Sequence, residues 1–273
     1  MKTTNAETPE AARRRADPVP RALTAISVLL TIGTAATDVA CFTRLGSVFA
    51  SVMTSNLVFL GLSAARHSGA LAARSGVAVA AYVIGVAAAS RLARADQRAG
   101  APVDPAGPAR PGGPARPGDS GGQPWSAWIA STLLVEIVLL AAFTAGWEIT
   151  GTTPEGGAQL LLLVAAAVAM GIQSGVVAVL GIAGVSTTYL TGTLTTLIDA
   201  LASPQPRPGA NVRRAAALCA LVGGAALGGL LLATAPAAVP AVPLTTLAGA
   251  IITGTLWLRP APADRRPADR RAR

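Results

Sequence analysis

The chain has 273 residues, of which 52% are hydrophobic, 4% aromatic and 13% charged. A water-soluble domain needs about a quarter of its residues charged, so this composition excludes an ordinary soluble protein and indicates lipid as the main solvent. The net charge of +9 does not predict nucleic-acid binding, because the arginines flank apolar stretches and no aromatic residues are interleaved with them.

The first half of the chain predicts four membrane helices. Residues 1–20 are polar and rich in Arg and Pro, which indicates a disordered basic tail and not a cleaved signal peptide. Residues 21–94 contain three apolar segments and form the first part of a membrane half. The Pro- and Gly-rich residues 95–124 predict a flexible loop, and residues 125–150 the fourth helix. The three apolar segments cover residues 22–40, 45–65 and 75–90.

The second membrane half covers residues 156–258 and predicts four more helices. Residues 156–198 contain no charge, which is enough for two helices with a break at the Gly-Ile-Ala-Gly sequence. Residues 215–258 are again uncharged, and three prolines divide them into two helices. Residues 259–273 predict a second disordered basic tail.

These eight apolar segments predict an all-α polytopic transmembrane bundle of six to eight spans, with eight preferred. The protein is expected in the cell membrane. With a cytoplasmic N-terminus, eight spans place the basic loops around Arg66 and Arg213 and the C-terminus on the cytoplasmic side. The same count leaves Arg91, Arg94 and Arg98 outside, which conflicts with the positive-inside rule.

An internal repeat relates the two halves. A shift of 137 residues places residues 45–60 on residues 182–197, where Thr-Ser-Asn falls on Thr-Gly-Thr. Many transporters consist of two such halves with the substrate between them. Four spans in each half would make the copies parallel, whereas three would make them inverted. The sequence leaves both arrangements open.

Asp38 is the most informative charge, because it lies near the end of the first span. An acidic group at membrane depth is costly unless it is paired, hydrated or protonated. One hypothesis is a cation or proton site. The other is an interfacial position in which Asp38 pairs with Arg44.

Two polar triplets form the second candidate feature. They begin at Thr54 and at Thr191, at matching places in the two halves. Polar groups in apolar helices bind across helices or mark local unwinding that exposes coordinating groups. The candidate solute or ion site therefore comprises Asp38, Thr54, Asn56, Gln173, Thr191 and Thr193. Small residues expected to permit helix packing or unwinding are Gly46, Ser55, Gly61, Gly171 and Gly192.

Gln173 joins the candidates because it is a polar residue in the middle of the fifth apolar segment. Glu136 and Asp199 are weaker candidates: Glu136 would line a cavity, and Asp199 lies near a helix end.

An enzyme is not expected. The segment 171–175 is similar to the Gly-x-Ser-Gly of intramembrane serine proteases but has one residue too many, and the only histidine, His67, falls in a loop. No His/Glu spacing for a metal and no cofactor motif is found.

The stretch around Asp38 resembles the signature of the YoaK family, bacterial membrane proteins catalogued as a domain of unknown function. A second resemblance covers the stretch around Gln173, and together they extend over about residues 22–258. Ser55 replaces a family glycine, and Ser174 and Gly175 replace Asn-Ala. The resemblance implies a membrane fold and no particular activity. The matching residues are Asp38, Leu45, Gly46, Phe49, Met53, Thr54, Asn56, Leu60, Gly61, Gly171, Gln173, Thr191, Gly192 and Thr193.

The function expected is that of a secondary transporter or permease for a small solute or ion, with Asp38 as the coupling site. No phosphate-binding Gly-x-x-x-x-Gly-Lys loop is present, so transport would be passive or driven by a gradient. The alternative is a non-transporting scaffold or modulator of a membrane complex. The expected partners are the lipid bilayer and a small-molecule or ion substrate, and the sequence is compatible with a homo-oligomer.

Overall fold

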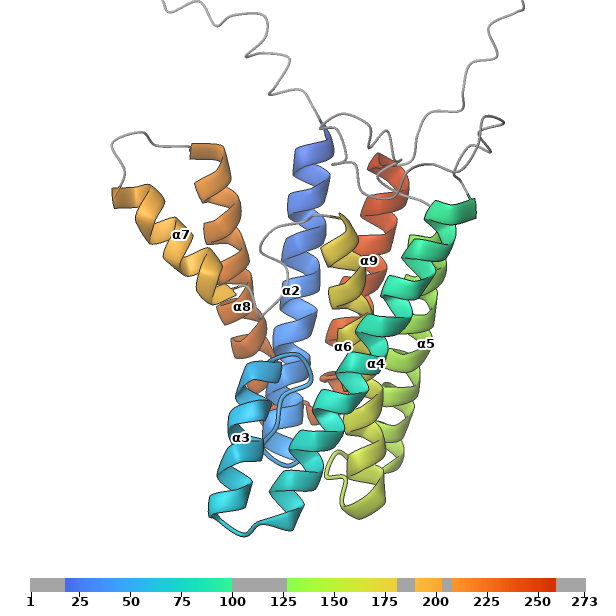
Figure 1. The fold of residues 1–273 in the computed structure, drawn as a ribbon, viewed down its shortest axis with the longest axis vertical. Coiled ribbons are helices and arrows are strands. Elements are labelled where there is room, and N and C mark those ends of the chain that lie inside the picture. The colour runs from blue at the N-terminus through green and yellow to red at the C-terminus, as the bar shows by residue number, and fades with distance from the viewer. Residues whose placement is uncertain (1–17, 100–126, 181–189, 203–207, 259–273) are drawn as a thin grey trace, which may run out of the picture.

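The computed structural model describes residues 18–99, 127–180, 190–202 and 208–258, and all regular elements in these ranges are helical. This confirms the all-α class. The long helices stand side by side in one bundle, and the short helices α3 and α7 lie toward its outside (Figure 1). The elements are α2 (Pro18–Arg44), α3 (Met53–Ala65), α4 (Gly69–Ala99), α5 (Ala127–Ile149), α6 (Gly156–Leu180), α7 (Leu190–Ala202), α8 (Pro208–Thr234), the 3₁₀ helix η2 (Pro236–Ala238) and α9 (Ala241–Trp257).

Helix length separates two kinds of element. In the described residues, six helical stretches of 22 to 28 residues are long and apolar enough to cross a membrane, which takes about 20 residues. Helices α3 and α7 have 13 residues each and reach only about 20 Å. The expected range of six to eight spans is confirmed, and helix length supports six, not the preferred eight.

The segment before α3 explains why this apolar stretch does not form a full span. The backbone turns into the left-handed region at Gly46 (φ 97°) and Ser47 (φ 62°), a conformation that ends a helix. Residues 45–52 form no helix, and α3 begins only at Met53. We call residues 45–52 the α2–α3 segment.

Two helices extend beyond their expected limits. Helix α2 already begins at Pro18, where proline is well suited to the first turn. Helix α4 continues to Ala99, because residues 91–99 are mostly good helix formers. The remainder of the two expected tails and of the expected loop lies outside the described residues.

The helix boundaries repeat along the chain. A shift of 137 residues places α3 on α7 with the same first and last positions. The same shift places α2 over α6 and α4 over α8, within a few residues at each end. Each half therefore has the order long helix, short helix, long helix, followed by a further long helix, α5 or α9.

The two copies run in opposite directions. In Figure 1, α2, α5 and α8 descend, whereas α6, α9 and α4 ascend. The short helices also oppose each other: α3 begins at mid-height and descends to α4, and α7 begins at mid-height and ascends to α8. Three long helices and one short helix per half thus produce an inverted arrangement.

The contacts between helices repeat in the same way, so that the main contacts of one half have counterparts in the other. Helix α2 packs along α8 and α9, and its counterpart α6 packs along α4 and α5. Helix α3 contacts α4, as α7 contacts α8, and α5 contacts α9. Each half therefore buries its first helix against helices of the other half, which places the interface between the halves at the centre of the bundle.

Glycines bring the crossing helices close together. A Cβ on Gly171 of α6 would lie 2.3 Å from the carbonyl oxygen of Tyr82 and 3.1 Å from the Cα of Gly85 on α4. In the matching pair, a Cβ on Gly224 of α8 would lie 2.6 Å from the carbonyl oxygen of Ile32 on α2. Such contacts supply the van der Waals attraction that holds helices together in lipid.

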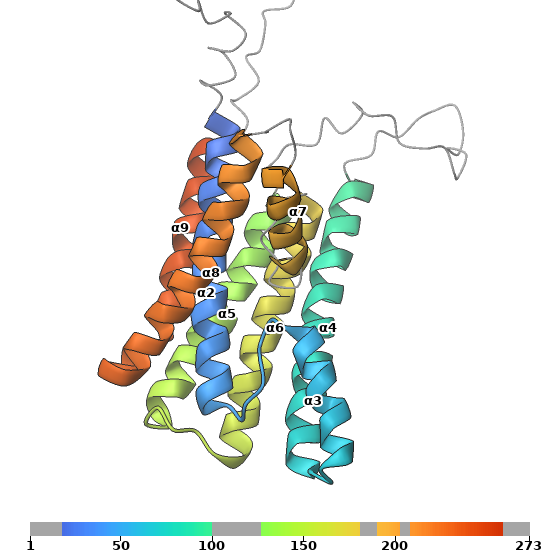
Figure 2. The same ribbon diagram turned by 90° about the vertical axis from the view of Figure 1, so that its left-hand side faces the viewer.

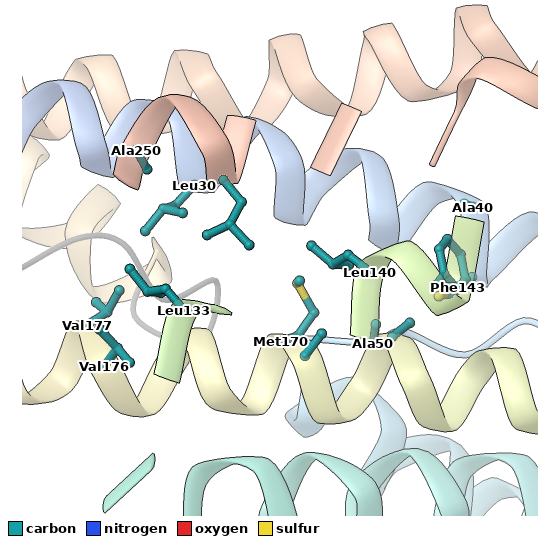
Figure 3. Close-up of a cluster of buried hydrophobic side chains, with 14 of the residues drawn as sticks. Leu30, Ala40, Ala50, Leu133, Leu140, Phe143, Met170, Val176, Val177 and Ala250 are labelled. Carbon is teal, nitrogen blue, oxygen red and sulfur yellow. The ribbon is translucent and has the colours of Figure 1, made fainter. Parts of the chain in front are cut away.

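The centre of the bundle is mostly apolar. Leu140 of α5, Met170 of α6 and Ala50 of the α2–α3 segment lie near one another there (Figure 3). At the lower end of α5, the buried Trp147 donates a hydrogen bond from Nε1 to the carbonyl oxygen of Pro236, at 3.0 Å. This bond links α5 to the turn before α9.

Candidate functional site

The α2–α3 segment is an irregular stretch of chain that is partly buried in the bundle. It leaves the lower end of α2, rises beside the bundle and joins α3 at mid-height (Figure 2). The Arg74 side chain fills the space beside Gly46, where a Cβ would lie 2.3 Å from its Cδ atom. Four residues of the segment are buried: Leu45, Val48, Ala50 and Ser51.

Asp38 holds the upper part of this segment. Its Oδ1 atom accepts hydrogen bonds from the backbone N–H groups of Ala50 and Ser51, both at 2.9 Å. Its Oδ2 atom accepts a bond of 2.5 Å from the hydroxyl of Ser51. The side chain is only 5% exposed. The hydrogen bonds of Asp38 thus run to the α2–α3 segment and not to Arg44, the partner expected for an interfacial position.

Asn56 holds the same segment from the other side. Its Oδ1 atom accepts from the N–H of Phe49 at 3.0 Å, and its Nδ2 atom donates to the carbonyl oxygen of Phe49 at 2.7 Å. The Phe49 ring stacks between Phe42 and Phe59, with centroid distances of 5.0 and 6.2 Å. Asp38 and Asn56, two of the expected site residues, therefore meet on one structural element.

The threonines of the two triplets occupy the first turns of the short helices. Thr54 of α3 and Thr191 of α7 are exposed in the described chain. The third members, Asn56 and Thr193, are both buried. The repeat therefore places an exposed hydroxyl and a buried polar side chain at matching positions in each half.

Gln173 joins the first helices of the two halves. Its Nε2 atom donates a hydrogen bond of 2.7 Å to the Oγ1 atom of Thr34, and both side chains are buried. Thr34 was not among the expected residues, because a threonine can satisfy its hydroxyl within its own helix. The bond places a polar contact between α2 and α6, inside the apolar core.

The five small residues have different surroundings. Gly46 and Gly171 lie in tight contacts, whereas a Cβ on Gly61 or Gly192 would meet no atom within 4 Å. Ser55 is half-buried. Close packing thus involves Gly46 and Gly171, and the glycines on the short helices lie in open positions.

Glu136 has surroundings that the sequence did not predict. Its side chain is fully buried in α5, and neither carboxyl oxygen has a hydrogen-bond partner within the described part of the chain. The sequence feature that marks Glu136 is its position as a single charge inside an apolar span. Among the described residues, no three His, Cys, Asp or Glu side chains form a group that could hold a metal.

The fold and these contacts define a multi-pass helical membrane protein with buried polar groups at the interface between two inverted halves. A family model described as "Protein of unknown function (DUF1275)" matches residues 26–253, and the chain belongs to this family. Neither the curated proteins nor the solved structures contain a match to the chain. The family assignment is compatible with the resemblance to YoaK proteins.

Proposed function

We propose that the protein is a secondary transporter or permease for a small solute or ion, of the YoaK type. The observation that carries this proposal is the inverted pair of halves, each with a half-length helix at the same position. In known secondary transporters, inverted repeats with interrupted helices place a site near the bilayer midplane. Motion of one half against the other then exposes that site to each side in turn.

The site of this proposal lies where the short helices begin. Thr54 and Thr191 offer exposed hydroxyls in the first turns of α3 and α7, and backbone groups there are not all used within a helix. In this arrangement Asp38 and Asn56 shape the site by fixing the α2–α3 segment, whereas the sequence had favoured Asp38 as the coupling group.

A cytoplasmic location of both termini is part of the proposal. Six spans place both ends on one side, together with Arg91 and Arg94 at the end of α4 and Arg213 and Arg214 at the start of α8. This removes the conflict that eight spans created. The opposite side has Arg44, Arg66 and Arg74, with Glu148 and Glu155 among them. The positive-inside rule then favours the side of the termini as the cytoplasm.

A non-transporting scaffold is the second candidate. The observation that favours it is that the polar atoms of Asp38 and Asn56 are hydrogen-bonded to the protein's own α2–α3 segment. A scaffold would need these bonds for rigidity and would have no use for exposed threonines at the starts of the short helices.

The experiment is a flux assay in proteoliposomes against a panel of labelled metabolites and ions. Thr54→Val and Thr191→Val each remove one hydroxyl from the proposed site. The matched control is Thr245→Val on α9, because its exposed hydroxyl bonds to the carbonyl oxygen of Ala241 in its own helix. We expect the first two variants to reduce flux of the transported solute at least tenfold and the control to leave it unchanged.

The outcomes separate the two candidates. Absence of flux above empty liposomes for the whole panel, with folded protein in the membrane, would favour the scaffold. Flux that both site variants leave unchanged would retain the transporter class and refute this site.

A further inference from the structure

Glu136 is a buried acid that the proposed site does not use. It lies in the span Trp128–Ile149, well inside both ends, with 0% of its side chain exposed. Both carboxyl oxygens lack a hydrogen-bond partner among the described residues. An ionised carboxylate in such surroundings is costly, so the neutral, protonated acid is the form that these surroundings accept.

The helix register shows which face carries this acid. Leu133 and Leu140 lie one turn before and one turn after Glu136, and both are buried. In Figure 3, Leu133 lies toward Val177 of α6, and Leu140 lies toward Met170 of the same helix. Glu136 therefore faces the α6 side of the bundle, at a level between these two apolar contacts.

Gln173 occupies the same level on α6, because it lies one turn from both Met170 and Val177. Its amide donates to Thr34 of α2 at 2.7 Å. The acid of α5 thus lies at the level of the polar contact that joins the first helices of the two halves. A rearrangement of the halves that separates Gln173 from Thr34 would change the surroundings of Glu136.

No neighbouring helix supplies a counter-charge at this level. Within their described bounds, α6 and α9 contain no charged residue. The charges of α4 lie toward its ends, and on α2 the titratable groups nearest this level, Asp38 and Cys41, lie one to two turns from Thr34. Tyr82 is the remaining titratable group in the middle of α4, and its side chain packs against the core. The charged residues of α4 in its described helix are Arg74, Arg91, Arg94, Asp96 and Arg98.

We propose that Glu136 is a proton-binding site and that the proton is the coupling ion, which rests on the proposed transport function. In the closed bundle Glu136 holds its proton. When the halves separate and water enters, the O–H bond breaks, the electron pair stays on the carboxylate oxygen, and water accepts the proton. The reverse transfer from the other side of the membrane restores the acid.

A proton suits this place better than a metal ion. Metal cations such as Na⁺ or Ca²⁺ need several oxygen ligands. Leu133, Leu140, Met170 and Val177 offer none, and the buried hydroxyl of Thr132, one turn before Glu136, donates to the carbonyl oxygen of Trp128.

The test uses infrared difference spectroscopy of the full-length protein in lipid, recorded while the bulk pH is raised and lowered. The C=O stretch of a protonated carboxylic acid identifies the neutral form. We expect a band at neutral pH that disappears reversibly as the pH rises and is lost in Glu136→Gln. The control Glu148→Gln changes the exposed acid at the end of the same helix and keeps the band.

Two results would overturn the proposal. A band that survives in Glu136→Gln belongs to another acid. A band that Glu136→Gln removes, but that ignores pH until the protein unfolds, marks a permanently neutral structural group. Should Glu136→Gln fail to assemble, Glu136→Asp keeps the acid, and the band must then shift. These spectra need no transported solute, so failure of the proton site is distinguishable from failure in the flux panel.

Discussion

Replacing Asp38 by alanine tests whether this carboxylate fixes the α2–α3 segment. The change removes three hydrogen bonds and leaves the backbone N–H groups of Ala50 and Ser51 buried without their acceptor. Each buried donor left unpaired costs about 1–3 kcal/mol, and removal of a buried charge returns part of this. We expect a net loss of about 2–4 kcal/mol for Asp38→Ala.

Asparagine at position 38 keeps the size and shape of the side chain but removes its negative charge, so it tests the contribution of the charge alone. Asp38→Asn keeps one oxygen that can accept from both N–H groups, and the loss is that of the charge assistance, about 1–2 kcal/mol. Glu148→Ala is the matched control, because it removes an exposed acid, and we expect a change within about 0.5 kcal/mol.

The assay combines thermal unfolding in detergent with hydrogen exchange of the peptide that covers residues 45–56. We expect faster exchange of the Ala50 and Ser51 amides in Asp38→Ala, intermediate exchange in Asp38→Asn and no change in the control. Unaltered exchange at these two amides in Asp38→Ala would refute the reasoning, whatever the melting temperature.

Three further predictions follow from the packing. Asn56→Leu removes both hydrogen bonds to Phe49 and should accelerate proteolysis within the α2–α3 segment; equal cleavage rates would contradict this. Gly171→Val places a side chain against the α4 backbone and should prevent assembly, whereas Gly192→Val meets open space and should be recovered from the membrane like wild type. A double-mutant cycle of Gln173→Leu and Thr34→Val should give a coupling of about 0.5–2 kcal/mol in unfolding experiments, and additive effects would exclude the bond between the halves.

The sequence predicted the fold class well, because membrane helices are selected by apolar length. Each of the eight apolar segments contains a helix in the part of the chain that the structure describes. The number of spans was harder to predict, since residues 45–65 contain enough apolar residues for a span. Composition does not reveal that Gly46 and Ser47 take positive φ values and shorten the helix to 13 residues.

The candidate site was predictable in part. Asp38 and Asn56 stood out as polar residues in apolar surroundings, but, apart from the hydroxyl of Ser51, the partners described for them above are backbone groups that any sequence would carry. Gln173 was identified, whereas its partner Thr34 was not. Glu136 was underrated, because the absence of partners for a buried acid depends on the packing of the neighbouring helices.

The inverted arrangement of the halves follows from the helix boundaries. The sequence alone did not distinguish it from a parallel arrangement. The 137-residue shift was visible in the segments around Thr54 and Thr191. Whether the copies are parallel or inverted depends on whether α3 and α7 cross the membrane, and both are too short to do so.

The most direct test of this inverted six-span arrangement is the accessibility of single cysteines to a membrane-impermeant maleimide, applied from either side of sealed vesicles. Cys41 and Cys219 are first replaced by alanine. Reporters are then introduced at His67, between α3 and α4, at Ala95 near the end of α4, and after the C-terminal residue. We predict that the Ala95 reporter reacts from the same side as the C-terminal reporter and that the His67 reporter reacts from the opposite side. Reaction of the His67 reporter from the side of the C-terminus, with the Ala95 reporter on the other side, would mean that α3 crosses the membrane and would contradict the inverted arrangement.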